Sequence, residues 1–109
     1  MKKELYLVLK NTDKALLTLE ELNREGFNAT VVSTESLRHA VEDFPEEQHF
    51  INLRHIEQKE LQQSVLCLFI VEENKLETIK NVIRNYTNNF KDIKGFMYSR
   101  DIQDYEGSI

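Results

Sequence analysis

The sequence is poor in cysteine and has no long apolar run. Cys67 is the only cysteine, so no disulfide can form within the chain, and its place in an apolar stretch indicates a small buried side chain. No stretch approaches the ~18 apolar residues of a membrane span. The first residues also lack the apolar segment of a signal peptide. We therefore expect a cytoplasmic protein without a membrane span.

Basic residues are also few. The chain has 14 Lys and Arg against 19 Asp and Glu, which gives a net charge of -5. Proteins that bind nucleic acid need clustered Lys and Arg, because these displace the counterions of the phosphates. The acidic balance therefore argues against a nucleic-acid partner.

Two apolar runs, residues 5–9 and 65–71, dominate the 109 residues. Neither alternates with polar residues as a strand with one wet face does, so both predict strands that are buried on both sides. We expect residues 1–109 to form a single domain. With only two helices, a domain of this length cannot easily cover both faces of a sheet. The sequence therefore predicts an oligomer whose subunits cover one another's second face.

Helical spacing of apolar residues predicts two helices. Residues 11–13 offer several N-caps for the first, and Gly26 is suited to end it. Asn74 followed by Glu77 resembles a capping box at the start of the second, which runs to about Asn89. The inward positions are Ala15, Leu16, Leu19 and Leu22 in the first helix, and Leu76, Ile79, Val82, Ile83, Tyr86 and Phe90 in the second.

The second strand is predicted over residues 27–32, at an edge of the sheet, and the fourth strand over residues 93–98. The resulting order is β-α-β-β-α-β, the pattern of the ferredoxin-like fold. This is an α+β fold with an antiparallel sheet, both helices on one face, and the first and third strands central. On this fold, Leu7→Asp or Phe69→Asp is expected to give insoluble or dissociated protein, because a buried unpaired carboxylate is costly. The chain from Arg100 to Ile109 is expected to be a polar tail.

The connection between the second and third strands, residues 34–63, is a long acidic insert. It carries seven carboxylates against three basic side chains. Its pattern predicts a short helix over residues 36–44 that ends at Pro45, and a brief extended stretch over residues 51–56. His39, His49 and His55 all lie in the insert, but they lack the spacing of a metal-binding motif, so no metal site is predicted.

No group of residues predicts catalysis. Glu72 and Glu73 are adjacent on a strand, so their carboxylates are expected to point apart. Ser64 and Ser99 have no base at a linked spacing. Tyr6, Tyr86 and Tyr98 fit core or interface aromatics better than a platform for stacking bases. We therefore expect no enzyme activity and no catalytic residue.

The segment Lys91-Asp92-Ile93-Lys94-Gly95-Phe96-Met97 leads into the last strand. Together with the order of elements and the long insert, it resembles the PII-like signalling proteins and their CutA relatives, which are ferredoxin-like trimers. In PII proteins the corresponding phosphate-binding loop is a Gly-Asp-Gly-Lys run. Asp92 and Lys94 match this run, whereas Lys91 and Ile93 replace its glycines. A Cβ at both positions obstructs the close approach of backbone N–H groups to a phosphate.

The resemblance implies a non-enzymatic regulatory homotrimer. Such a protein would bind a small anionic ligand or nucleotide at the clefts between subunits and signal to a protein partner through the insert. The expected ligand-binding residues are Lys94 first, then Lys91, Arg38 and Arg100. Whether the protein uses a cofactor is unknown from the sequence. Two alternatives stay open, a structural or interaction trimer without a ligand, and a CutA-like protein associated with metal ions.

Overall fold

The computed structural model describes residues 1–34 and 64–108. In chain order, the elements are β1 (Lys2–Lys10), α1 (Asp13–Arg24), β2 (Ala29–Thr34), β3 (Ser64–Glu72), the 3-10 turn η2 (Glu73–Lys75), α4 (Leu76–Thr87) and β4 (Gly95–Asp101). The predicted helix over residues 36–44, the extended stretch over 51–56 and the three histidines lie outside the described residues. Within the described residues, no helix is long and apolar enough to cross a membrane.

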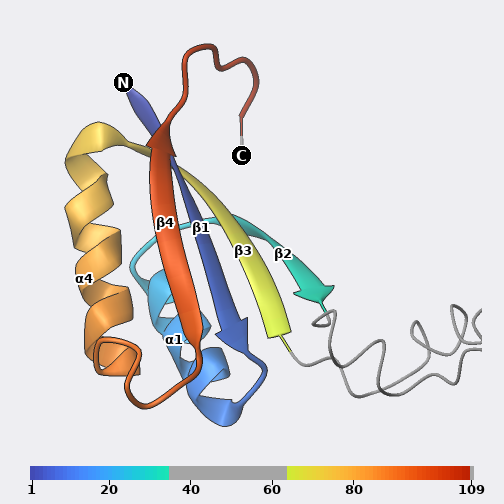
Figure 1. The fold of residues 1–109 in the computed structure, drawn as a ribbon. Coiled ribbons are helices and arrows are strands. Elements are labelled where there is room, and N and C mark those ends of the chain that lie inside the picture. The colour runs from blue at the N-terminus through green and yellow to red at the C-terminus, as the bar shows by residue number, and fades with distance from the viewer. Residues whose placement is uncertain (35–63, 109) are drawn as a thin grey trace, which may run out of the picture.

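The described strands form one antiparallel sheet in the order β2-β3-β1-β4. β1 and β3 are central, as predicted, and β2 lies at an edge. Both helices lie side by side against one face of the sheet, so the predicted α+β ferredoxin-like fold is confirmed (Figure 1). The long strands β1 and β3 pair along their whole length, from Lys2 opposite Glu72 to Lys10 opposite Ser64.

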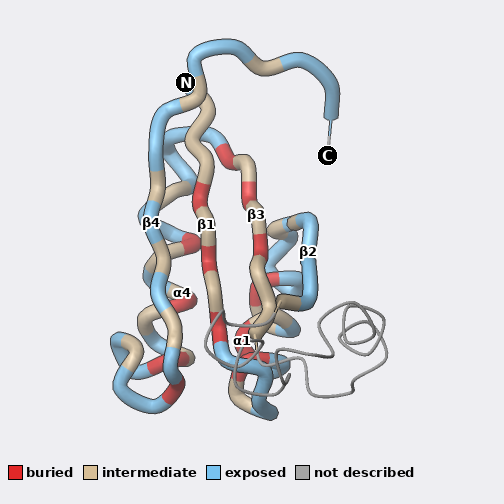
Figure 2. The backbone as a smooth tube through the Cα atoms, turned by 45° about the vertical axis from the view of Figure 1, so that its right-hand side comes forward, coloured by how far each residue is buried: buried red, intermediate tan, exposed pale blue. Residues whose placement is uncertain are grey.

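The core lies between the sheet and the two helices. From Leu5 to Leu9 in β1 and from Cys67 to Val71 in β3, buried residues alternate with half-buried ones (Figure 2). Because successive side chains of a strand point to opposite faces, the buried ones point toward the helices. The buried apolar residues of the central strands are Leu5, Leu7 and Leu9 in β1 and Cys67, Phe69 and Val71 in β3. The helices add Ala15, Leu22, Ile79 and Ile83. Burial raises the pKa of the Cys67 thiol to about 11, as expected for a structural rather than a reactive cysteine.

The first helix begins and ends where the sequence predicts. Thr12 is its N-cap, and the Thr12 hydroxyl accepts a hydrogen bond from the backbone N–H of Ala15 at 3.3 Å. α1 ends at Arg24, and Gly26 adopts a φ of 90°, a conformation that side chains disfavour. The chain then turns back into β2.

The start of the second helix differs from the prediction. Asn74 lies in η2, and α4 begins at Leu76 without a side-chain cap, so the predicted capping box is wrong. The helix ends at Thr87, and three successive residues with left-handed backbone follow: Asn88, Asn89 and Phe90, with φ of 52°, 55° and 62°. The buried hydroxyl of Thr87 supports this turn, because it accepts from the N–H of Phe90 at 3.1 Å and donates to the carbonyl of Ile83 at 2.7 Å.

The last strand begins later than predicted. Ile93 is only 5% exposed and packs in the core below the sheet, so β4 starts at Gly95 rather than at residue 93. A Cβ at Gly95 would clash with the carbonyl oxygen of Val8, which explains why glycine stands at the entry to the strand. β4 also includes Arg100 and Asp101, which the sequence analysis had assigned to the tail.

Candidate ligand site

The loop that joins α4 to β4 lies at the end of the sheet where β1 finishes. It spans residues 88–94 and contains all four residues that correspond to the Gly-Asp-Gly-Lys run of PII proteins: Lys91, Asp92, Ile93 and Lys94. Both lysines are exposed. The backbone carbonyl of Lys94 accepts a hydrogen bond from the N–H of Lys10 at 2.8 Å. Lys94 therefore sits on a backbone that is fixed to the central strand.

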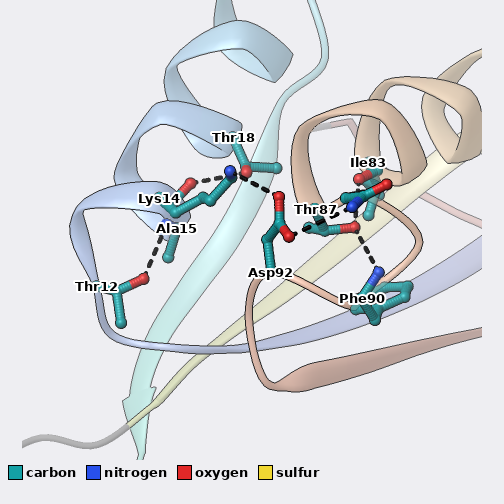
Figure 3. A network of polar contacts seen from close by, with 9 residues as sticks. Thr12, Lys14, Ala15, Thr18, Ile83, Thr87, Phe90 and Asp92 are labelled. Carbon is teal, nitrogen blue, oxygen red and sulfur yellow. Dashed lines mark hydrogen bonds and ion pairs between the residues drawn. The ribbon is translucent and has the colours of Figure 1, made fainter.

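Asp92 attaches this loop to both helices. Its carboxylate lies 3.0 Å from the Nζ of Lys14 on α1 and accepts from the side-chain amide of Asn88 at 3.3 Å (Figure 3). Its own N–H donates to the carbonyl of Thr87 at 3.1 Å. The hydrogen bond from Lys14, and then that from Asn88, lower the pKa of Asp92. Sequence analysis did not find the partnership with Lys14, because the two residues are 78 positions apart.

The residues that replace the PII glycines change what the loop can offer an anion. Ile93 is buried and acts as an apolar anchor. The N–H of Lys91 donates to the carbonyl of Asn88 within the loop at 3.1 Å, and the N–H of Asp92 donates to the carbonyl of Thr87 at the end of α4. Two backbone donors that could have turned toward a phosphate are thus occupied, whereas Lys91 and Lys94 themselves are exposed.

Arg100 lies far from this loop. It is six residues after Lys94, near the other end of β4, and at about 3.3 Å per residue the two backbones are separated by roughly 20 Å. Its Nε lies 3.0 Å from the Oε1 of Glu4, and its guanidinium stands 5.9 Å from the ring centre of Tyr6. The charge of Glu4 raises the pKa of Arg100. One subunit therefore does not bring Arg100 and Lys94 together, and Arg38 lies outside the described residues.

The carboxylates at the end of β3 do not converge. Glu72 pairs with Lys2 at 2.6 Å, whereas Glu73 lies 3.6 Å from the Nζ of Lys3. The Glu72 pKa is lowered by Lys2, which is the behaviour of an ion-paired carboxylate rather than of a general acid. Within residues 1–34 and 64–108, no group of three or more His, Cys, Asp or Glu side chains is placed to hold a metal ion.

The face of the sheet opposite the helices is largely apolar, and no helix among the described residues covers it (Figure 1). The rings of Tyr6 and Tyr98 lie 4.9 Å apart, and the ring of Phe96 stacks along the strand at 6.4 Å from that of Tyr98. Phe96 and Tyr98 remain 54% and 51% exposed. We call this surface the open face; its members are Glu4, Tyr6, Val8, Thr30, Val32, Leu66, Leu68, Ile70, Phe96, Tyr98 and Arg100.

Solved structures share the fold of this chain. CPII from Thiomonas intermedia K12, whose structure is described as bound to ADP, AMP and acetate, matches with a TM-score of 0.60 and 17% identity over 96% of this chain and 89% of that one. A functionally unknown protein from Pediococcus pentosaceus ATCC 25745 matches with a TM-score of 0.61 and 11% identity over 98% and 97%. No protein-family model matches the sequence, and neither does any curated protein. The chain therefore has a divergent form of the PII-like fold.

Proposed function

We propose that this protein is a non-enzymatic regulatory module of the PII-like kind, a homotrimer that binds a small anionic ligand at the clefts between subunits. It would report the ligand to a protein partner through residues 34–63. The single observation that carries the proposal is the shared fold with CPII, described as bound to ADP, AMP and acetate, all of which are anions. Fold alone does not carry function. The next arguments therefore rest on this chain's own residues.

The open face supports an assembly. A soluble monomer rarely leaves a contiguous apolar surface of this kind on its sheet, and burying apolar area is worth roughly 25 cal/mol per Å². Three copies that pack their open faces around an axis would cover Tyr6, Phe96 and Tyr98 without using the helices, which already cover the other face.

The loop supports an anionic ligand. Lys94 and Lys91 are exposed on a segment that Asp92 and the buried Ile93 hold in place. Because two N–H groups of the loop already donate to backbone carbonyls, we expect binding to depend on charge and to weaken with salt. Arg100 is too far from Lys94 within one subunit, so its part in the site requires a neighbouring copy; Arg38 stays a prediction.

Two measurements test the proposal. Light scattering at micromolar concentration should give the mass of a trimer, and a clean monomer would contradict the assembly. Thermal unfolding in the presence of ADP, AMP or small organic anions should show a raised Tm for at least one of them, because a ligand that binds only the folded state stabilises it. A trimer that none of these anions stabilises would favour the alternative, an interaction module without a ligand.

A further inference from the structure

Lys10 lies directly beside Lys94. The register that pairs Leu9 with Gly95 places Lys10 opposite Lys94, and the hydrogen bond between their backbones confirms this neighbourhood. Facing residues of antiparallel strands have Cβ atoms about 4.5–5.5 Å apart. In β1, Leu5, Leu7 and Leu9 point toward the helices, so Lys10 continues the alternate positions that form the open face.

Two positive charges lie next to each other at this point. Within residues 1–34 and 64–108, no carboxylate lies within ion-pair distance of Lys10 or Lys94, whereas Lys2, Lys3 and Lys14 each pair with one. Asp92, three residues from β4, is already engaged by Lys14 and Asn88. Like charges that face each other across strands destabilise a sheet. Among the described residues, these two adjacent lysines thus lack a compensating carboxylate at the end of the central strands.

The backbone that carries the pair is fixed before any ligand arrives. Lys10 ends a strand hydrogen-bonded on both sides, and Lys94 follows the anchor Ile93 and the Asp92 contacts. Because this backbone is already ordered, only the two lysine side chains lose conformational freedom when their ammonium groups hold an anion between them. A group with two negative charges can satisfy both lysines at once, whereas a single carboxylate leaves one charge unmatched.

We infer that Lys10 is the second cation of the anion site at Lys94, and that the pair selects a doubly charged phosphate-type group over a monocarboxylate. This inference rests on the proposed function, which places the ligand at Lys94. The phosphate-type group can belong to a nucleotide or be an inorganic polyphosphate.

Binding of pyrophosphate, ADP and acetate to the full chain, measured by calorimetry at low salt, tests the inference. Lys10→Gln and Lys94→Gln should each weaken pyrophosphate binding by about tenfold, since each removes one charge-assisted contact. Lys75→Gln is the matched control, because Lys75 is an exposed lysine in η2 away from this end of the sheet. Acetate binding should be weak and nearly unchanged in Lys10→Gln.

The comparison of ADP with pyrophosphate identifies the source of the phosphates. Equal affinities would show that the phosphates are the recognised part of the ligand, and a much higher affinity for ADP would show that the ligand is a nucleotide. Both results are compatible with a site formed by Lys10 and Lys94.

The failures are distinguishable. If Lys94→Gln weakens binding and Lys10→Gln does not, Lys10 is excluded and the proposed function survives. If the wild type binds none of the three anions, the proposed function and this inference fall together.

The melting temperature of the ligand-free protein tests the inference independently. Lys10→Gln should raise Tm by about 1–3 °C at low salt, because it removes the repulsion, and the gain should vanish in 1 M salt. No gain over Lys75→Gln would overturn the inference.

Discussion

The two faces of the sheet are built from the same strands, yet their side chains are buried to different extents. On the covered face, Leu7 and Phe69 are at most 2% exposed beneath α1 and α4. On the open face, Tyr98 and Phe96 of β4 are about half exposed in the single chain. The first set therefore determines whether one chain folds. In the proposed trimer the second set contacts further copies, so substitutions on the two faces should separate folding from assembly.

The largest effect is expected on the covered face. Leu7→Asp or Phe69→Asp places a carboxylate among apolar side chains with no partner, which costs several kcal/mol and exceeds what a marginally stable domain can absorb. Circular dichroism should show loss of secondary structure, not a folded monomer. This sharpens the sequence prediction, which allowed dissociation: a folded but monomeric Leu7→Asp protein would contradict the covered face as described.

A substitution on the open face should leave the fold intact and break the assembly. Tyr98→Asp introduces a charge at a position that is 51% exposed in the single chain, so the chain itself loses little. In the proposed trimer the same carboxylate would be buried against a neighbour. Light scattering should report monomers with an unchanged circular dichroism spectrum.

Leu16→Asp is the control for this substitution. The sequence predicts that Leu16 points inward, which is wrong, because Leu16 is 56% exposed on α1. It lies on the helical side of the molecule, so its replacement should leave the mass unchanged. Equal effects of Tyr98→Asp and Leu16→Asp would show that the open face has no special part in assembly.

The two ends of the sheet extend the comparison. At one end, cross-strand ion pairs join Lys2 with Glu72, Lys3 with Asp101 and Arg100 with Glu4. At the other end, Lys94 has no such partner among the described residues. Lys94→Ala should therefore reduce the affinity for the anionic ligand by about tenfold or more, while the fold remains. Calorimetry of both proteins measures the change, and a ligand bound equally well by both would place the site elsewhere.

The smallest effect concerns the contact that holds the loop. Asp92→Asn removes the ion pair with Lys14, so at neutral pH the variant should unfold at a slightly lower temperature than the wild type. The pKa of Asp92 is lowered from its ordinary 3.8, so its contribution is present above that pH and is lost as the pH falls through the folded-state pKa. Tm measured from pH 7 to pH 2 should show the two proteins converging in acid, and a constant difference would contradict the ion pair.

Much of the fold was predictable because its signals are local. Helical spacing in α1, the cap at Thr12 and the stop at Gly26 act within a few residues of where they are read. The errors were also local in origin. Asn74 and Glu77 had the right spacing for a capping box, but η2 intervenes; Ile93 was assigned to a strand because apolar residues follow it, whereas the core takes its side chain.

The sequence by itself determined the order of strands and helices, and it identified β1 and β3 as central, because only central strands need apolar residues at every position. It could not determine which side of each strand meets the helices, since a continuous apolar run has no two-residue period to distinguish one face from the other. Only the tertiary structure decided that Leu7 is covered while Tyr6 is not, that Asp92 meets Lys14, and that Lys10 faces Lys94. The contacts of Asp92 with Lys14 and of Lys10 with Lys94 join residues about 80 positions apart. Such pairs follow from strand register and helix packing, which no local pattern specifies.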